Sequence, residues 1–484
     1  MILKEKKYTK CILISCYICY SIHVEGIEMK DIFLVNYSVK GVKTLDKLVS
    51  LSFYKKIFTK NSDTQEYNVK GIYGMNGSGK SGIVTSVQIL KNILINPEYL
   101  NNPIVQKNLE AIINKKTGEL FIEADYISGI GDSFLYFRYM VTLSKDINGK
   151  YVISHEQLSS KKATSKNDYM MKIFEVIDGE VVFSVLKEDN EFSNIILKKT
   201  TNLLSTASMC ALFREKILTA SLRNNKIYKD VLFKALCALF VFGAKLHVYM
   251  DQSDDHREYF VQKSLKYYDD LNNNSELNLL MKNYIDLPNY YEAFIKVSGN
   301  LIHKDKYDQF LSAVKKLCEF LRIFKSDLLD IEIEKKEDHD VFICNLIMVY
   351  DSYKIHAEFE STGIKKLIQL FMYLKEMVQG DIIFIDEFDS NLHDVYLCVL
   401  LEYLMGYAKG QLCFTTHNVG PMDILKQNKK SIDFLSIDGT IYPWTTNGNY
   451  SPSKLYRNGM IEGSPFNVDS IDFIGIFGIS EECE

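Results

Sequence analysis

The stretch that decides the fold of this chain is Gly74-Met75-Asn76-Gly77-Ser78-Gly79-Lys80-Ser81. It has the pattern of a glycine-rich loop whose successive backbone N–H groups point at a phosphate chain. The flanking sequence fits, because residues 69–73 predict a short strand and residues 82–94 carry apolar side chains at helical spacing. In such a loop the lysine reaches the β- and γ-phosphates and the serine hydroxyl is a ligand of Mg²⁺. We therefore expect the nucleotide-binding residues to be Gly74, Asn76, Gly77, Ser78, Gly79, Lys80 and Ser81.

Length and composition limit the remaining possibilities. A chain of 484 residues is too long for one ordinary core, so two or three structural units are expected. Its hydrophobic content of 47% and charged content of 25% are typical of a soluble globular protein. The net charge of −5 excludes a basic field over the whole surface, so nucleic-acid binding would need a local patch.

The first 28 residues resemble a secretory signal, because a basic stretch precedes the apolar run 11–22. That run is too short to span a bilayer. Cys16 and Cys19 within it have no second ligand pair for zinc, and the scattered cysteines fit a reducing compartment. The apolar run 231–244 is interrupted by Lys234, which indicates a core helix. We expect a cytoplasmic protein without a membrane segment, whose functional start is near Met29.

Strands are predicted on both sides of the loop. Apolar segments at 32–37 and 48–53 precede it, and five more follow at 120–126, 134–143, 151–158, 172–177 and 180–185. Asn148-Gly149 and Asp178-Gly179 predict two-residue hairpin turns with positive φ at both positions. These strands are expected to form an antiparallel layer beside the nucleotide-binding sheet. The periodicity then turns helical from about 205 to 323, and strands return at 329–334 and 341–350.

Residues 381–387 (DIIFIDE) predict an apolar strand that ends in two carboxylates. Such a run fits a strand buried on both faces of a parallel sheet, and ligands bind at the carboxyl ends of these strands. Asp386 is then expected to hold Mg²⁺, directly or through water, and Glu387 to polarise the water that attacks the γ-phosphate.

Two further segments indicate function only through their position relative to the phosphate loop and the acidic strand. Residues 360–366 (ESTGIKK) open a helix that Gly380 ends, and a helix N-terminus presents backbone donors to an anion. Residues 412–418 form another apolar strand, which ends in His417, placed to reach a γ-phosphate or its attacking water. Each feature alone is commonly structural.

This order of motifs resembles the ATP-binding-cassette (ABC) superfamily and, within it, the heads of SMC-like and RecF-like ATPases. The chain looks most like bacterial AAA-type ATPases related to the overcoming-lysogenization-defect (OLD) family. The resemblance rests on residues 360–366, on Asn391-Leu392-His393 after the acidic pair, and on the tail segments 453–459 and 463–465. It covers roughly residues 29–156 and 331–477.

The resemblance implies an α/β P-loop NTPase of the ABC-ATPase head type, with a mixed sheet flanked by helices, an antiparallel β-layer and a large, mostly α-helical insertion. It divides the chain into an N-terminal extension, which need not be native, an N-terminal lobe of the head, a helical insertion and a C-terminal lobe. These parts cover residues 1–28, 29–200, 201–328 and 329–484.

The family also implies residue roles. Lys80 and Glu387 would be catalytic, His417 would be the switch residue, and Ser361 and Gly363 would contact the γ-phosphate bound to the opposite subunit. ATP would then join two heads into a homodimer, and hydrolysis would separate them; higher oligomers are left open. The chain departs from the transporter signature at residues 364 and 365, and its Mg²⁺-sensing glutamine and adenine-stacking residue are not placed.

Rival classes fit less well. A hexameric AAA+ motor has its acidic strand closer to the phosphate loop and sensor arginines beyond it, and a transporter subunit has the standard signature. Residues 419–484 are too few for an appended nuclease domain. Two functions are left: an ATPase sensor that controls a separate effector, encoded nearby, in a bacterial phage-defence (abortive-infection) system, or a DNA-binding maintenance or repair ATPase. The mild acidity and the lack of long SMC arms favour the first.

Overall fold

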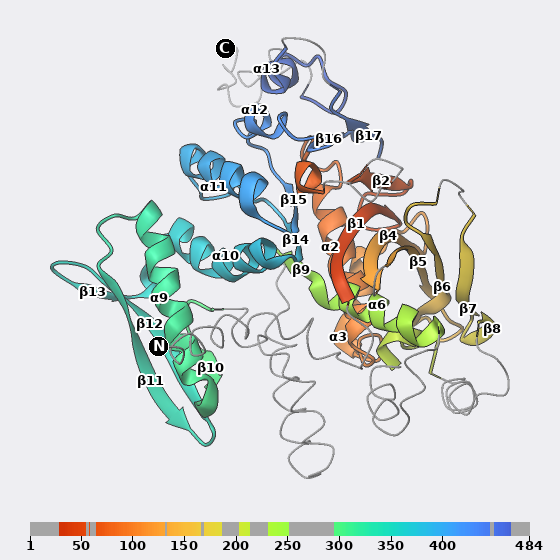
Figure 1. Ribbon diagram of the computed structural model, residues 1–484, viewed down its shortest axis with the longest axis horizontal. Helices are drawn as coiled ribbons and strands as arrows, with labels where there is room; N and C mark the ends of the chain where they lie inside the picture. The colour runs from red at the N-terminus through yellow and green to blue at the C-terminus, as the bar shows by residue number, and fades with distance from the viewer. Residues whose placement is uncertain are drawn as a thin grey trace, which may run out of the picture.

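The computed structural model describes residues 29–54, 58, 64–130, 133–165, 169–185, 203–212, 231–250, 295–445 and 450–465. The predicted N-terminal extension, with Cys16 and Cys19, lies outside these residues. The described chain forms three sheets with helices between and beside them (Figure 1). Among the described residues, no helix combines the length and the apolar character needed to cross a bilayer.

A six-stranded sheet contains the strands predicted around the phosphate loop. Its order is β17 (Ile441–Pro443), β16 (Ile432–Leu435), β3 (Val69–Tyr73), β15 (Gln411–Thr415), β14 (Ile382–Ile385) and β9 (Leu246–Tyr249). The pairings are parallel except for β16–β17. Strands β3, β14, β15 and β16 are buried along their whole length, and β14 is apolar throughout, as predicted. In β3 and the unpredicted β16, the buried Lys70 and Asp433 form an ion pair at 2.7 Å. All carboxyl ends of the parallel strands therefore meet at one edge of the sheet.

Strand β9 was not predicted. It lies inside the range 201–328 that the sequence analysis assigned to a mostly α-helical insertion, yet it pairs with β14 from Leu246–Ile382 to Tyr249–Ile385. The expected core helix is present as α6 (Val231–Lys245), and β9 follows it without a glycine or proline break. A short buried strand that continues an apolar helix carries no separate periodic signal, which explains the miss. The domain boundaries themselves stay a prediction.

The predicted antiparallel layer is confirmed as a seven-stranded sheet. Its order is β2 (Val49–Ser52), β1 (Met29–Lys40), β4 (Leu120–Ile130), β5 (Ser133–Lys145), β6 (Tyr151–Lys162), β7 (Met171–Ile177) and β8 (Glu180–Ser184). Asp178 and Gly179 both have positive φ, as expected for a two-residue turn. The prediction for Asn148-Gly149 was wrong: only Gly149 has positive φ, because Asp146 and Lys150 close a longer loop whose backbone bond measures 2.8 Å.

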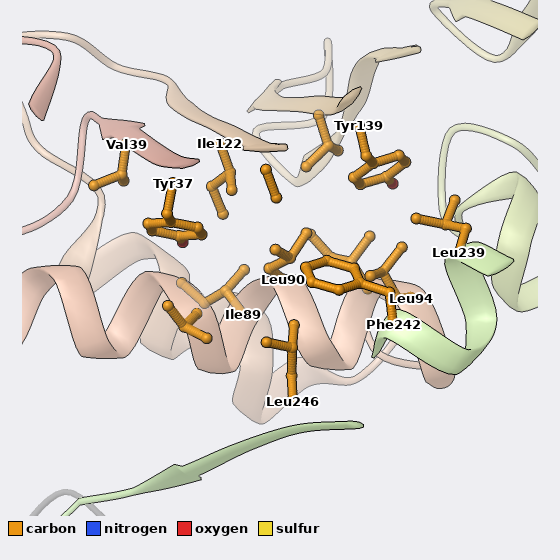
Figure 2. Close-up of a cluster of buried hydrophobic side chains, with 14 of the residues drawn as sticks. Tyr37, Val39, Ile89, Leu90, Leu94, Ile122, Tyr139, Leu239, Phe242 and Leu246 are labelled. Atoms are coloured by element: carbon orange, nitrogen blue, oxygen red, sulfur yellow. The ribbon is translucent and has the colours of Figure 1, made fainter. Parts of the chain in front are cut away.

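Helix α2 (Lys80–Ile95), which follows the phosphate loop, packs between this sheet and the parallel one. Figure 2 shows Ile89, Leu90 and Leu94 of α2 facing apolar side chains of both the antiparallel sheet and α6. Gly243 brings α6 close to α2, because a Cβ there would lie 2.8 Å from Leu94 Cβ. The side chain of Gln411 ties the two sheets together by bonding the backbone N–H and carbonyl of Leu34, at 2.6 and 2.9 Å.

The opposite face of the parallel sheet is covered by α10 (Thr362–Gln379), α11 (Asp394–Tyr407), α12 (Met422–Leu425) and α13 (Pro452–Arg457). Along β14, Ile382 and Phe384 face the α2 side, whereas Ile383 and Ile385 face these helices. A third unit is formed by β10 (Asn300–His303), α9 (Tyr307–Phe324), β11 (Asp330–Asp338), β12 (Val341–Val349) and β13 (Lys354–His356). The other elements are α3 (Pro103–Ile112) and the 3-10 turns η1 (Gln65–Tyr67), η4 (Lys304–Lys306) and η5 (Ala357–Phe359). This third unit packs against α10.

Candidate nucleotide-binding site

The phosphate loop joins β3 to α2, as the sequence predicts. Gly79, the residue before α2, has φ of 105°, and a Cβ there would lie 2.3 Å from Leu45 Cδ2. Gly77 also has positive φ, at 80°, and stands exposed with open space around it. Because no side chain caps the start of α2, its N-terminal end is presented to an anion.

The Lys80 side chain is held inside the loop. Its ammonium donates to the Gly74 carbonyl at 2.7 Å and to the Met75 carbonyl at 3.0 Å, and the residue is 6% exposed. Burial lowers the pKa of Lys80 to about 8, while the nearby carboxylates of Asp386 and Glu387 oppose that shift. The cation of the loop and the acidic end of β14 therefore face the same space, as predicted.

Thr415, at the end of β15, organises the two carboxylate residues. Its hydroxyl donates to Asp386 Oδ1 at 2.5 Å and accepts from the Glu387 backbone N–H at 2.8 Å. Asp386 is 7% exposed, whereas Glu387 is exposed to solvent. Sequence analysis missed this threonine, because it drew attention only to the histidine two residues later. A hydroxyl at the end of a strand beside the Asp-Glu strand was the available signal.

His417 lies next to the same groups. Partial burial and the Lys80 ammonium lower the pKa of His417, while Asp389, Glu387 and Asp386 oppose the shift. The imidazole is therefore held predominantly neutral at pH 7, able to accept or donate one hydrogen bond. The structure thus brings together Lys80, Asp386, Glu387 and His417, from β3–α2, β14 and β15.

The donor set suits Mg²⁺. Ser81 lies half-buried in the first turn of α2, and Asp386, at the end of β14, has a carboxylate that Thr415 orients. Hydroxyl and carboxylate oxygens are the ligands that Mg²⁺ prefers, usually with phosphates and waters completing the octahedron. Among the described residues, no group of three or more His, Cys, Asp or Glu side chains could hold a metal without such help.

The Ser-Thr-Gly segment opens α10, as predicted. Ser361 is the N-cap, and its hydroxyl accepts from the Ile364 N–H at 3.4 Å. Gly363 packs on the turn after β14, because a Cβ there would lie 2.5 Å from the Asn391 carbonyl oxygen. Ser361 is exposed, and its role and that of Gly363 at a second subunit stay a prediction.

Within the loop, Asn76 is exposed and Ser78 is 2% exposed. The Ser78 hydroxyl is buried without a hydrogen-bond partner among the described residues. An unsatisfied buried hydroxyl costs free energy, so its presence at a phosphate-binding loop is consistent with a group that moves when ligand binds.

The C-terminal tail supplies a contact that sequence analysis missed. Tyr456 of α13 stacks on Phe434 of β16, with ring centroids 5.5 Å apart. Burial raises the pKa of Tyr456 to about 12, and a hydrogen bond from the Gly74 backbone N–H opposes that shift. The first residue of the phosphate loop is thus held by the tail. Asp423 anchors α13, because it accepts from the hydroxyls of Ser451 and Ser453 at 2.5 and 2.6 Å.

Comparison with known proteins gives one distant structural likeness. No protein-family model matches the chain, and no curated protein matches it. Among solved structures, one described as the recombination mediator protein RecF–ATPrS in the RecFOR pathway is similar over 86% of this chain and 99% of its own, with 13% sequence identity and a TM-score of 0.37. A likeness this distant assigns neither a family nor a function.

Proposed function

We propose that this protein is an ATPase of the ABC-head type, which binds ATP with Mg²⁺ and hydrolyses it to ADP and phosphate. The observation that supports this most is the convergence of Lys80 with Asp386, Glu387 and His417 at the carboxyl edge of one parallel sheet. Lys80 balances the phosphate charge, and the N-terminal end of α2 adds backbone donors.

Glu387 acts as the catalytic carboxylate. It is exposed and therefore accessible to the attacking water, whereas Asp386 beside it is buried and bonded to Thr415. His417, largely neutral near pH 7, contacts the γ-phosphate or the water. Ser81 and Asp386 would hold Mg²⁺, which would supply charge neutralisation of the phosphates when bound.

Nucleotide binding is tested by isothermal titration with Mg-ATP. Lys80→Ala is expected to abolish binding, because it removes the cation that faces the phosphates. Lys150→Ala, an exposed lysine in the β5–β6 loop, is the matched control and should bind as the unaltered protein does. Wild-type affinity in Lys80→Ala would remove the phosphate-loop assignment.

Hydrolysis is tested with Glu387→Gln, which keeps the shape of the side chain but cannot take up a proton. It should retain ATP and lose turnover by about 100-fold or more. Glu402→Gln, an exposed glutamate on α11, is the control. An unchanged turnover rate in Glu387→Gln would contradict the catalytic role.

We further propose that ATP joins two copies of the chain, each lending Ser361 and Gly363 to the other's nucleotide. The exposed start of α10 supports this, because Ser361, which caps the Ile364 N–H, and Thr362 both face solvent, so an anion from outside the subunit can reach the N-terminal turn of the helix. With ATP, Glu387→Gln should form a dimer in light scattering, and adding Ser361→Arg should return it to monomer while ATP binding persists. A dimer that forms equally well with Ser361→Arg would exclude this interface.

For the cellular role, we propose the control of a separate effector in a phage-defence system. The surface charge of the third sheet supports a protein partner over duplex DNA, since the adjacent Lys335 and Lys336 of β11 are flanked by Glu334 and Glu337. The alternative, a DNA-maintenance ATPase, predicts that duplex DNA stimulates hydrolysis. Co-purification with the product of an adjacent gene and no DNA stimulation would favour the effector role.

A further inference from the structure

Lys366 is a buried lysine on the helix that opens with the Ser-Thr-Gly segment. The residue is 5% exposed, and its ammonium donates to the backbone carbonyl of Glu387 at 2.5 Å and to the Ser390 hydroxyl. A buried ammonium is costly unless it is well bonded, so a lysine at this position has a specific role. Both contacts are to the segment that carries the catalytic carboxylate.

The backbone of Glu387 is unusual. Its φ is 47°, in the left-handed region that costs a non-glycine residue about 1–2 kcal/mol. Side chains bond both of its backbone polar groups: the N–H donates to Thr415, and the carbonyl accepts from Lys366. The carbonyl also accepts from the Ser390 N–H at 3.1 Å. Such a conformation persists only where the surroundings hold it, so these contacts fix the backbone from which the Glu387 carboxylate extends.

The same segment is joined to the start of α10 at two more places. The Thr362 hydroxyl donates to Asn391 Oδ1 at 3.2 Å, and Gly363 lies against the Asn391 carbonyl, with space for no Cβ. Asn391 also has positive φ, at 61°. The start of α10 and residues 387–391 therefore form one tightly packed unit.

We propose that Lys366 is a positioning residue that fixes Glu387 in its reactive orientation and couples it to α10. The inference rests on the proposed ATPase function and deepens it. In the ATP-joined dimer, Ser361 and Gly363 at the start of α10 contact the nucleotide of the other subunit. When α10 of one subunit binds the nucleotide of the other subunit, Lys366 holds Glu387 of its own subunit in the reactive orientation. Each subunit therefore hydrolyses its ATP only when the other subunit has also bound ATP.

The test is Lys366→Met, which keeps the aliphatic stem and removes the ammonium. We expect kcat to fall about 100-fold, the size of the effect when a catalytic group is misplaced by about 1 Å. The dissociation constant for a non-hydrolysable ATP analogue should change by less than about threefold, since the phosphate loop is untouched. Lys375→Met, a half-buried lysine further along α10, is the matched control and should keep the wild-type kcat.

A double variant separates positioning from general damage. Added to Glu387→Gln, Lys366→Met should lower turnover no further, because both changes remove the same contribution. Ser390→Ala, which removes a hydroxyl that the ammonium contacts, should also lower kcat, by a smaller factor. It provides an independent result if Lys366→Met does not fold.

A wild-type kcat in folded Lys366→Met, or a fall that adds fully to that of Glu387→Gln, would overturn the inference. Failure of the proposed function is distinguishable from this result. If the unaltered protein does not hydrolyse ATP, or Glu387→Gln leaves turnover unchanged, the ATPase assignment itself fails. If the unaltered protein and Glu387→Gln behave as expected and Lys366→Met keeps the wild-type kcat, only the positioning role fails.

Discussion

Thr415→Val provides the sharpest test of how the site is built. Valine has nearly the shape of threonine, but it removes the hydroxyl that donates to Asp386 at 2.5 Å and accepts from the Glu387 N–H at 2.8 Å. Thr415 is fully buried, so water does not replace these bonds. A hydrogen bond to a charged group contributes about 1.5–3 kcal/mol, and an unsatisfied buried N–H costs about 1–3 kcal/mol. The free energy of unfolding should therefore fall by about 2.5–6 kcal/mol.

The effect on catalysis should exceed the effect on binding. Without the hydroxyl, Glu387 loses one of the two side chains that hold its left-handed backbone, and a misplacement of about 1 Å reduces the rate by about 100-fold. Steady-state ATPase assays at saturating Mg-ATP should show this fall in kcat, with KM changed by less than about threefold.

Ser431→Ala is the matched control. Its hydroxyl is buried next to β16 and donates to two backbone carbonyls, those of Leu425 and, at 2.9 Å, of Asn428. It should lose stability without losing kcat, because it touches no group of the site. If Thr415→Val loses only stability and retains its wild-type kcat, the threonine is structural and the account of the Glu387 backbone is wrong.

Three further predictions concern the loop, the tail and the sheet. Gly79→Ala should abolish ATP binding in titration, because its φ of 105° is strained and its methyl group would meet Leu45; normal affinity would contradict this. Tyr456→Phe keeps the ring but loses the bond from Gly74, so ATP affinity should weaken about two- to tenfold; unchanged affinity would assign the tail no part in binding. Burial raises the pKa of Glu156 from 4.5 to about 7, so the fold loses about 3 kcal/mol of stability as pH rises from about 4.5 to about 7. Denaturant unfolding should show this loss, and Glu156→Gln should remove the pH dependence; an equal loss in the variant would assign it to other groups.

The parts of the site that sequence could predict are those with strict local requirements. Gly77 and Gly79 adopt positive φ in a strand–loop–helix unit, a constraint that only glycine meets easily. The phosphate loop can therefore be predicted from eight consecutive residues. The strand that precedes Asp386 and Glu387 can be predicted because a strand buried on both faces is typically a continuous apolar run. In each case the structural requirement concerns residues that are adjacent in the sequence, so a short stretch of sequence is enough to predict the element.

The parts that sequence missed depend on partners far along the chain. Thr415 bonds a residue 28 positions earlier, Lys366 bonds one 21 positions later, and Tyr456 contacts Gly74, which lies 382 positions earlier (456 − 74). Strand β9 takes its place in the sheet from its partner β14, not from its own pattern. The identity of a threonine, a lysine or a tyrosine in the sequence does not indicate which distant residue it will contact.

The sequence by itself determined which segment forms the glycine-rich loop between a strand and a helix, which strand brings the carboxylates, and that an antiparallel layer lies beside them. It did so because backbone dihedral preferences and burial periodicity act on neighbouring residues. Only the tertiary structure decided how Glu387 is held, how α10 is joined to it and how the tail reaches the phosphate loop. Those contacts arise when parallel strands bring their carboxyl ends to one edge, and hydrogen bonds across that edge depend on distances in space rather than along the chain.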